Sequence, residues 1–207
     1  MKTKHILILL SMSVFSSLNF FCSNDPDKDF DSNILTDPRD GRAYQTVTIG
    51  TQTWMAENLD FRTADSSWYN NNDSSANHTL GRLYTWNRAL TASPPGWHLP
   101  TDTEWTVLST YLGGATVAGG KLKEAGTAHW ASPNTGATNE TGFTALPGGY
   151  RLADGTYFLN AMSSSWWSAT ESDSISAFGR VLFYNNINVG KLLSYRTYGH
   201  SVRCVRD

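Results

Sequence analysis

Cysteine is scarce in this chain, and little chemistry can be built on it. Two of the 207 residues are Cys, at positions 22 and 204. Cys22 belongs to the N-terminal leader, so the rest of the chain holds a single thiol, Cys204, with no evident disulfide partner. Cys204 is interpreted as a small buried residue. A reactive or intermolecular thiol is the alternative.

Charged residues are also scarce, at 16% of the chain, against about a quarter in a typical domain. The formal net charge is −2, and from position 41 onward twelve acidic and twelve basic residues balance. A neutral domain offers no electrostatic footprint for a phosphate backbone, so nucleic acid is not an expected partner. No basic amphipathic helix is present, so the domain itself is not expected to lie on a membrane.

A long apolar run occurs once, at the N-terminus. Lys2 and Lys4 precede an apolar stretch over positions 6–21, which is the order of an export signal. Cys22 follows and resembles a bacterial lipoprotein acylation site, although Phe21 stands where a small residue is usual. Residues 1–22 are therefore predicted to be an export signal, with lipidation of Cys22 or ordinary cleavage as the two outcomes. The predicted location is the cell envelope, as an outer-membrane lipoprotein facing the surface or the periplasm.

Residues 23–39 are predicted to be an acidic tether, and the domain is expected to span residues 40–207. Within the tether, four aspartates alternate as at the start of a calcium loop: Asp25, Asp27, Asp29 and Asp31. The Gly and the bidentate Glu that such a loop requires are missing, so no metal site is predicted there. The segment is interpreted as solvated chain.

Local patterns predict an α+β domain with two main helices and short, mostly antiparallel strands. Leu83, Trp86 and Leu90 have helical spacing within residues 82–90. Thr101 and Glu104 form a capping box for a second helix that runs to Gly113.

The strands are expected early as one hairpin and late as a series. The hairpin covers 44–49 and 53–56, and residues 60–79 are expected to form a long loop. The late strands are expected at 143–146, 150–152, 157–159, 165–168, 180–184 and 201–206.

Many ordered motifs carry a family resemblance. Two of them are Gly96-Trp97-His98-Leu99-Pro100-Thr101-Asp102 and Leu146-Pro147-Gly148-Gly149-Tyr150-Arg151. The others lie at residues 40–42, 44, 46–47, 49–52, 54–59, 81–84, 86, 104–105, 139, 142–143, 166–168, 170–171 and 201–207. Across this span the chain resembles the major paralogous domain family first named from Fibrobacter succinogenes.

The resemblance implies a C-type-lectin-like fold and no known activity. That fold hosts sugar binding, protein binding and catalysis, so function has to be argued from a site. The resemblance also implies a Cys that pairs with the Cys of the last strand. Ser93 stands at that place here, which leaves Cys204 unpaired.

Catalysis is not expected. The formylglycine-generating enzymes of this fold need two active-site cysteines, and the domain has one. No Gly-x-Ser-x-Gly elbow occurs, and the five histidines are scattered along the chain. No pair of candidate ligands has the spacing that places both on one face, and the calcium motifs of lectins are missing, so no metal or cofactor is predicted. His98 is interpreted as a hydrogen-bonded structural residue.

Aromatic and amide side chains collect late in the chain, where they suit a ligand surface. The predicted site consists of Trp167, Tyr184, Asn185, Asn186, Asn188, Tyr195 and Tyr198. Aromatic faces stack on sugar C–H surfaces, and Asn amides both donate and accept hydrogen bonds. Adjacent Trp166 and Trp167 would point to opposite faces of a strand, so at least one of them is expected in the core.

These observations favour an exported binding module that recognises a glycan or a protein without catalysis. One alternative is a structural subunit of an envelope assembly, which would expose a large apolar patch. Another is an unrecognised hydrolase, which would gather polar groups with shifted pKa values in one pocket.

Overall fold

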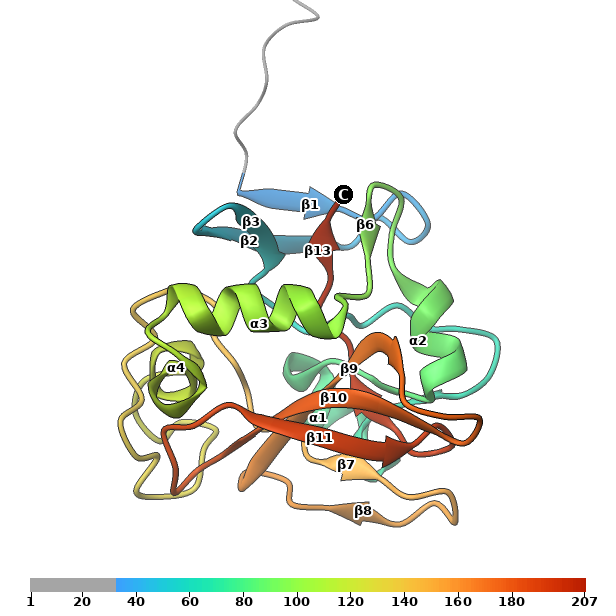
Figure 1. The fold of residues 1–207 in the computed structure, drawn as a ribbon. Helices are drawn as coiled ribbons and strands as arrows, with labels where there is room; N and C mark the ends of the chain where they lie inside the picture. The colour runs from blue at the N-terminus through green and yellow to red at the C-terminus, as the bar shows by residue number, and fades with distance from the viewer. Residues whose placement is uncertain (1–32) are drawn as a thin grey trace, which may run out of the picture. The chain divides into compact units, whose positions relative to one another are not determined.

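The computed structural model describes residues 33–207. The predicted export signal, Cys22 and the start of the predicted tether lie outside the described residues. The described chain is an α+β domain in which helices pack against and between two antiparallel-rich sheets, as Figure 1 shows. The coarse fold class predicted from the sequence is therefore confirmed.

The first sheet has the strand order β1-β2-β3-β13-β6 and joins both ends of the domain. Its strands are β1 (Ile34–Thr36), β2 (Ala43–Ile49), β3 (Gln52–Met55), β13 (Val205–Arg206) and β6 (Trp97–His98). The predicted hairpin is β2 and β3. The domain begins earlier than predicted, because residues 34–36, assigned to the tether, pair with β2, and Asp37 is fully buried.

The second sheet has the order β11-β10-β9-β12-β5-β4. Its strands are β11 (Gly190–Tyr195), β10 (Ser176–Phe183), β9 (Ser163–Glu171), β12 (His200–Ser201), β5 (Leu83–Tyr84) and β4 (Ser67–Trp68). A separate hairpin, β7 (Tyr150–Arg151) and β8 (Tyr157–Phe158), lies beside it. The single last strand predicted at 201–206 is two short strands, β12 and β13, which belong to different sheets.

Helix α3 (Asp102–Tyr111) follows its sequence signals closely. The Thr101 hydroxyl accepts from the Glu104 backbone N–H at 3.2 Å, and the Glu104 carboxylate accepts from the Thr101 N–H at 2.7 Å. This reciprocal pair satisfies two of the free donors at the helix start. Figure 1 shows α3 lying between the two sheets.

The other helices were predicted less well. Helix α2 (Trp86–Ala92) is shorter than the expected 82–90 helix at its start, because Leu83–Tyr84 pairs as strand β5. The loop expected over 60–79 contains β4, α1 (Ser74–Asn77) and the 3-10 turns Asn70–Asn72 and His78–Leu80.

Helix α4 (Ala115–Leu122) was not predicted, since it contains Gly119 and Gly120. Glycine disfavours an isolated helix. A Cβ on Gly119 would come within 2.4 Å of the Asn188 carbonyl oxygen, and one on Gly120 within 2.4 Å of the Gly136 carbonyl oxygen. Close approach of neighbouring backbone therefore explains both glycines.

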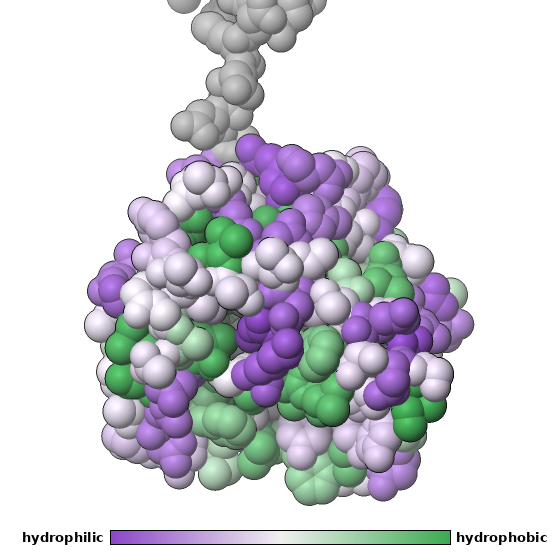
Figure 2. Space-filling model, viewed as in Figure 1, coloured by the Kyte–Doolittle hydropathy of each residue, from purple (hydrophilic) through white to green (hydrophobic). Residues whose placement is uncertain are grey.

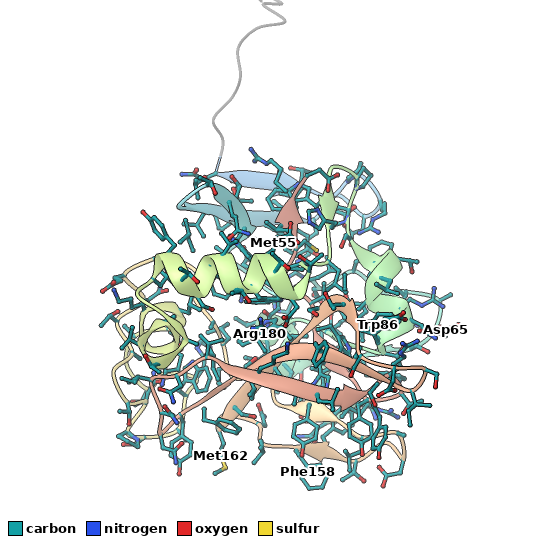
Figure 3. The ribbon with its side chains drawn as sticks, in the orientation of Figure 1. Met55, Asp65, Trp86, Phe158, Met162 and Arg180 are labelled. Atoms are coloured by element: carbon teal, nitrogen blue, oxygen red, sulfur yellow. The ribbon has the colours of Figure 1, made fainter. Side chains whose placement is uncertain are left out.

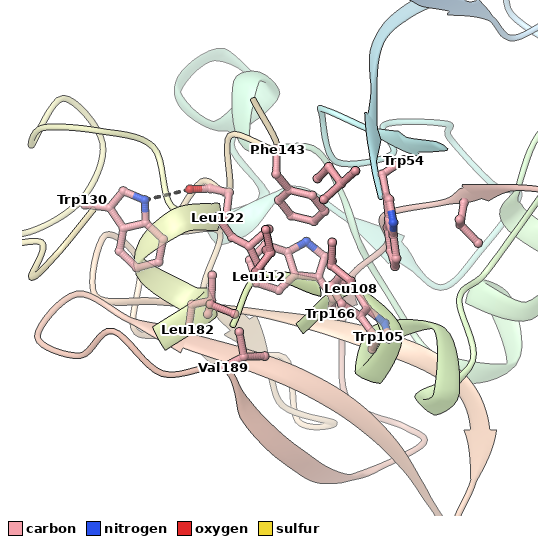
Figure 4. Close-up of a cluster of buried hydrophobic side chains, with 14 residues drawn as sticks. Trp54, Trp105, Leu108, Leu112, Leu122, Trp130, Phe143, Trp166, Leu182 and Val189 are labelled. Carbon is pink, nitrogen blue, oxygen red and sulfur yellow. Dashed lines mark hydrogen bonds between the residues drawn. The ribbon is translucent and has the colours of Figure 1, made fainter. Parts of the chain in front are cut away.

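Aromatic rings fill the core between the sheets. Trp54 and Trp105 lie with ring centroids 4.8 Å apart, and the ring centroid of Trp166 lies 6.2 Å from that of Trp105. Figure 4 shows these three indoles within the buried cluster. Trp167 points the other way into a second buried cluster around Tyr84. Both neighbouring tryptophans of β9 are therefore core residues, because each face of the strand is covered.

Candidate functional site

One cavity of the described domain opens on the β9–β10–β11 face, beside the β7–β8 hairpin. Its volume is about 480 Å³. The cavity is lined by Tyr150, Leu159, Ser163, Ser165, Ser176, Val181, Phe183, Leu192, Leu193, Ser194, Tyr195, Tyr198 and His200. It is called the apolar pocket below.

Large apolar side chains are exposed around this pocket. Leu193 is 58% exposed and Tyr195 53% exposed. The others in the same region are Phe158, Leu159, Met162 and Phe183. Figure 3 shows Phe158 and Met162 at the β8 end of the domain, and Figure 2 shows hydrophobic side chains gathered over this part of the surface. Exposed apolar patches of this kind mark interaction surfaces more often than isolated exposed residues do.

A histidine held between two serines forms the polar floor of the pocket. His200 Nδ1 lies 2.5 Å from Ser165 Oγ, and His200 Nε2 lies 2.8 Å from Ser194 Oγ. Burial lowers the pKa of His200 to about 3, so the imidazole is neutral near pH 7. A neutral imidazole has one donor and one acceptor nitrogen. One serine therefore donates to the ring and the other accepts, so the accepting hydroxyl can donate its O–H elsewhere. For Ser165 the Gly149 carbonyl lies within reach at 3.4 Å.

This arrangement differs from an activated nucleophile. No Asp or Glu lines the pocket, and both imidazole nitrogens face serine hydroxyls in place of an orienting carboxylate. A group with a pKa of about 3 is a weak base at neutral pH, whereas an efficient general base has a pKa near the working pH. The floor can hold a ligand hydroxyl or carbonyl in place, and the walls can bury its apolar part.

The structure brings together only part of the predicted site. Tyr195 and Tyr198 line the apolar pocket, with ring centroids 5.5 Å apart in an edge-to-face contact. The prediction for Trp167 is wrong, because its side chain is fully buried, and its indole N–H donates to the Tyr84 carbonyl at 2.7 Å.

The remaining predicted residues lie at the other end of the β10–β11 hairpin and do not line the apolar pocket. These residues are Tyr184, Asn185, Asn186 and Asn188. Tyr184 is half-buried against the first core cluster. The length of β11 separates them from Tyr195 and Tyr198, because Tyr195 is its last residue, Tyr198 follows it, and the amides precede its first residue.

A buried lysine holds the turn between β10 and β11, residues 184–189, in place; it is called the far turn below. The Lys123 ammonium donates to the carbonyls of Thr135, Phe183 and Asn186 at 3.0, 3.1 and 2.9 Å. Its side chain has no exposed surface, and burial lowers its pKa to about 8. The buried ammonium thus fixes the backbone of the amide-rich turn. Nothing in the sequence distinguished Lys123 from the half-buried Lys121.

Most residues of the apolar pocket could not be predicted from the sequence. Ser165, Ser194 and His200 come from β9, β11 and β12, and their side chains meet only because β12 pairs with β9, β9 with β10 and β10 with β11. The one usable signal was the alternation along β9, which places Ser163 and Ser165 on the same face.

Other expectations concern metals and membranes. His98 is a bonded structural residue as expected, with Glu104 at 2.8 Å and Asp207 at 2.7 Å. Among residues 33–207, no three His, Cys, Asp or Glu side chains gather as metal ligands would. In the same part of the chain, no helix has the length and apolar character needed to cross a membrane.

The comparisons with known proteins identify a family. The Fibrobacter succinogenes major domain matches residues 47–206, which is most of the chain. No curated protein and no solved structure matches the chain. The match covers all of the elements from β3 to β13, including every strand that lines the apolar pocket. The chain therefore belongs to the Fibrobacter succinogenes major domain family.

Proposed function

We propose that this protein is an exported cell-envelope binding module that takes a glycan or a protein ligand in the apolar pocket and has no catalytic activity. The observation that carries the proposal is the pocket of about 480 Å³ with its rim of exposed apolar side chains. We further propose a C-type-lectin-like fold and anchoring in the outer membrane through a lipid on Cys22.

The chemistry of the pocket supports ligand binding. Specific pockets are mostly apolar, with a few polar groups that orient the ligand. Here Tyr195 and Tyr198 offer aromatic surface at the rim, and the Ser165–His200–Ser194 floor offers hydroxyls at fixed positions. A sugar ring could stack on the tyrosines and bond to the floor. An apolar side chain of a protein would fill the same space.

The proposed absence of catalysis rests on the floor. His200 is held neutral by burial, and no carboxylate in the pocket orients it for proton transfer. A serine nucleophile needs a base that can take its proton near neutral pH.

A binding screen with matched variants tests the proposal. The purified protein would be applied to a glycan array, with calcium and with chelator, and to a display of envelope proteins. Tyr195→Ala should abolish the binding found, whereas Tyr111→Ala, which removes a 67% exposed tyrosine from α3, should not. Equal binding by both variants would reject the pocket as the ligand site.

The exposed apolar rim also supports a second candidate, a structural subunit of an envelope assembly. A subunit of this kind would bury the rim against a partner in the intact envelope. Crosslinking from a photoreactive residue at position 193, on intact cells, distinguishes the two. A single stoichiometric protein partner indicates an assembly, and ligand-dependent crosslinking indicates a receptor.

Location is tested separately from ligand binding. Metabolic labelling with a fatty acid should mark the protein, and Cys22→Ser should remove the label and release the protein from the membrane fraction. An unlabelled wild-type protein in the soluble envelope fraction would show ordinary cleavage of the leader.

A further inference from the structure

A second cavity, on the opposite side of the β7–β8 hairpin, has a different chemistry from the apolar pocket. Its volume is about 290 Å³, and its lining includes Arg62, Arg82, Trp68 and Tyr69. The lining contains no Asp or Glu and no aliphatic side chain. We call it the arginine cavity.

The hairpin places the two cavities apart because side chains alternate along a strand. Tyr150 stacks on Phe158, with ring centroids 5.7 Å apart, and lines the apolar pocket. The neighbouring Arg151 instead lies 4.0 Å from the centre of the Trp68 ring. Tyr157 donates to Asn72 Oδ1 at 2.7 Å. These contacts hold two lining residues of the arginine cavity in fixed positions.

Positive charge exceeds negative charge at the arginine cavity. Asp60 is the buried carboxylate behind it, and two guanidinium groups, those of Arg42 and Arg82, share this one carboxylate. Asp60 also accepts from the Tyr69 hydroxyl at 3.1 Å. The nearby Asp73 carboxylate is engaged as the cap of α1, where it accepts from backbone N–H groups, and it does not line the cavity.

Arg82 is held in place but is incompletely bonded. Its guanidinium lies 4.1 Å from the centre of the Tyr69 ring, and its Nε is 3.4 Å from Asp60 Oδ1. That Nε is buried against Asp60 and is not accessible to a ligand, and Nη1 donates to the Ser67 carbonyl at 3.5 Å. Within residues 33–207, Nη2 is the guanidinium nitrogen left to donate into the cavity. A fixed guanidinium with unused donors is preorganised for an anion, because its planar fork matches a carboxylate.

Arg62 supplies the second charge. Its side chain is exposed at the mouth of the cavity, and within residues 33–207 it forms no ion pair and no hydrogen bond. A free arginine beside a fixed one can close on an anion from the solvent side.

The remaining lining favours a sugar over a simple anion. Ser67, Ser74 and Asn72 offer hydroxyl and amide groups that can donate and accept, as vicinal sugar hydroxyls require. Trp68 and Tyr69 are half-buried and offer aromatic edges and faces. We propose that the arginine cavity binds the carboxylate of an acidic sugar, with Arg62 and Arg82 on the carboxylate and the serines and Asn72 on the hydroxyls. This site stands independently of the apolar pocket.

Paired monosaccharides test the charge requirement. Methyl glucuronide and methyl glucoside differ in the carboxylate, and glutarate carries carboxylates without a sugar ring. Titrations followed by NMR of the Trp68 indole N–H should show saturable binding of the glucuronide and much weaker binding of the other two. Raising the salt concentration should weaken glucuronide binding, because exposed charges are screened.

Arg62→Gln is the decisive variant, since Arg62 has no hydrogen bond or ion pair within residues 33–207 to lose. It should weaken glucuronide binding roughly tenfold, as expected for one hydrogen-bonded charge. Arg206→Gln removes the same charge from β13 in the other sheet and should leave the affinity unchanged. Both variants should keep the wild-type melting temperature.

Three results would overturn the proposal: equal affinity for glucuronide and glucoside, unchanged affinity in Arg62→Gln, or equal binding of glutarate. The last would show an unselective carboxylate site that an acidic peptide could also occupy. Tyr195→Ala, measured in parallel, should not alter glucuronide binding. The proposal for the apolar pocket and the proposal for the arginine cavity can therefore be rejected independently of each other.

Discussion

The thiol of Cys204 donates a 3.3 Å hydrogen bond to the hydroxyl of Ser93, although 111 residues separate them in the chain. Ser93 stands where the family resemblance implied a cysteine, and the contact shows that the two positions are neighbours in the fold. Cys204 is fully buried, and burial raises the pKa of its thiol to about 12. The thiol therefore stays protonated, which argues against the reactive alternative.

Ser93→Cys should restore a disulfide between α2 and the last strands. Closing a loop of this length is expected to stabilise the domain by about 2–4 kcal/mol. The check is a thiol assay together with denaturation curves with and without reductant. Ser93→Ala is the control, because it loses the hydrogen bond and cannot crosslink. A free-thiol content that does not fall on oxidation would contradict the prediction.

Asn58→Ala should destabilise the domain, because the neutral Asn58 amide accepts hydrogen bonds from a buried guanidinium. Its Oδ1 accepts from Arg203 Nε at 3.1 Å, from Arg203 Nη2 at 2.8 Å and from Trp166 Nε1 at 2.8 Å. Arg203 is fully buried, and burial lowers its pKa to about 9. Arg203 keeps its bonds to the Met55 and Phe143 carbonyls, at 3.2 and 2.5 Å. We therefore expect a loss of about 1.5–3 kcal/mol in urea denaturation, as for hydrogen bonds to a charged group.

Asn58→Asp is the matched control for that experiment. It keeps the acceptor oxygens and adds a countercharge, while it loses the donor that bonds the Leu80 carbonyl at 2.8 Å. Its loss should be clearly smaller than that of the alanine variant. Equal losses would show that the Arg203 contacts do not determine the effect.

The stability of the domain should fall in mild acid because of His200. Burial lowers the pKa of His200 from 6.5 to about 3. Between these values the unfolded chain binds a proton at His200 and the folded chain does not. The free energy of unfolding therefore falls as the pH drops from 6.5 towards 3, and above pH 6.5 it does not depend on the titration of His200. The slope is about 1.4 kcal/mol per pH unit.

His200→Gln isolates this effect, since glutamine can bond to both serines and does not titrate. Denaturant midpoints measured from pH 3 to 7 should depend less on pH in the variant than in the wild type. Parallel curves would mean that His200 is not the titrating group.

Lys123→Met should loosen the far turn of the β10–β11 hairpin. It leaves three carbonyl oxygens without their ammonium donor, and an unsatisfied buried acceptor costs about 1–3 kcal/mol. Hydrogen exchange of the amides at 184–189 should speed up. Lys121→Met, which removes only an exposed pair with Glu140 at 3.1 Å, should change stability by less than about 1 kcal/mol. Equal exchange rates in the two variants would contradict the prediction.

Elements with strong local signals could be predicted from the sequence. The hairpin at β2–β3 and the capped helix α3 follow from strand propensity, turn chemistry and the Thr101–Glu104 box, which act over a few residues. Helix α4 and strand β5 could not be predicted, because their conformations depend on distant partners. Gly119 lets the backbone of α4 approach the Asn188 carbonyl, which a Cβ would prevent, and Leu83 pairs with Ser201 of β12.

The candidate sites divide in the same way. The sequence by itself determined the family, the α+β class and the aromatic residues Tyr195 and Tyr198, because motifs and side-chain types are local properties. Only the tertiary structure decided that Trp167 is buried, that His200 meets two serines, and that Arg62 and Arg82 share a cavity. Each depends on which strands are neighbours, and strand pairing between segments far apart in the chain is set by the whole core and not by any short stretch of sequence.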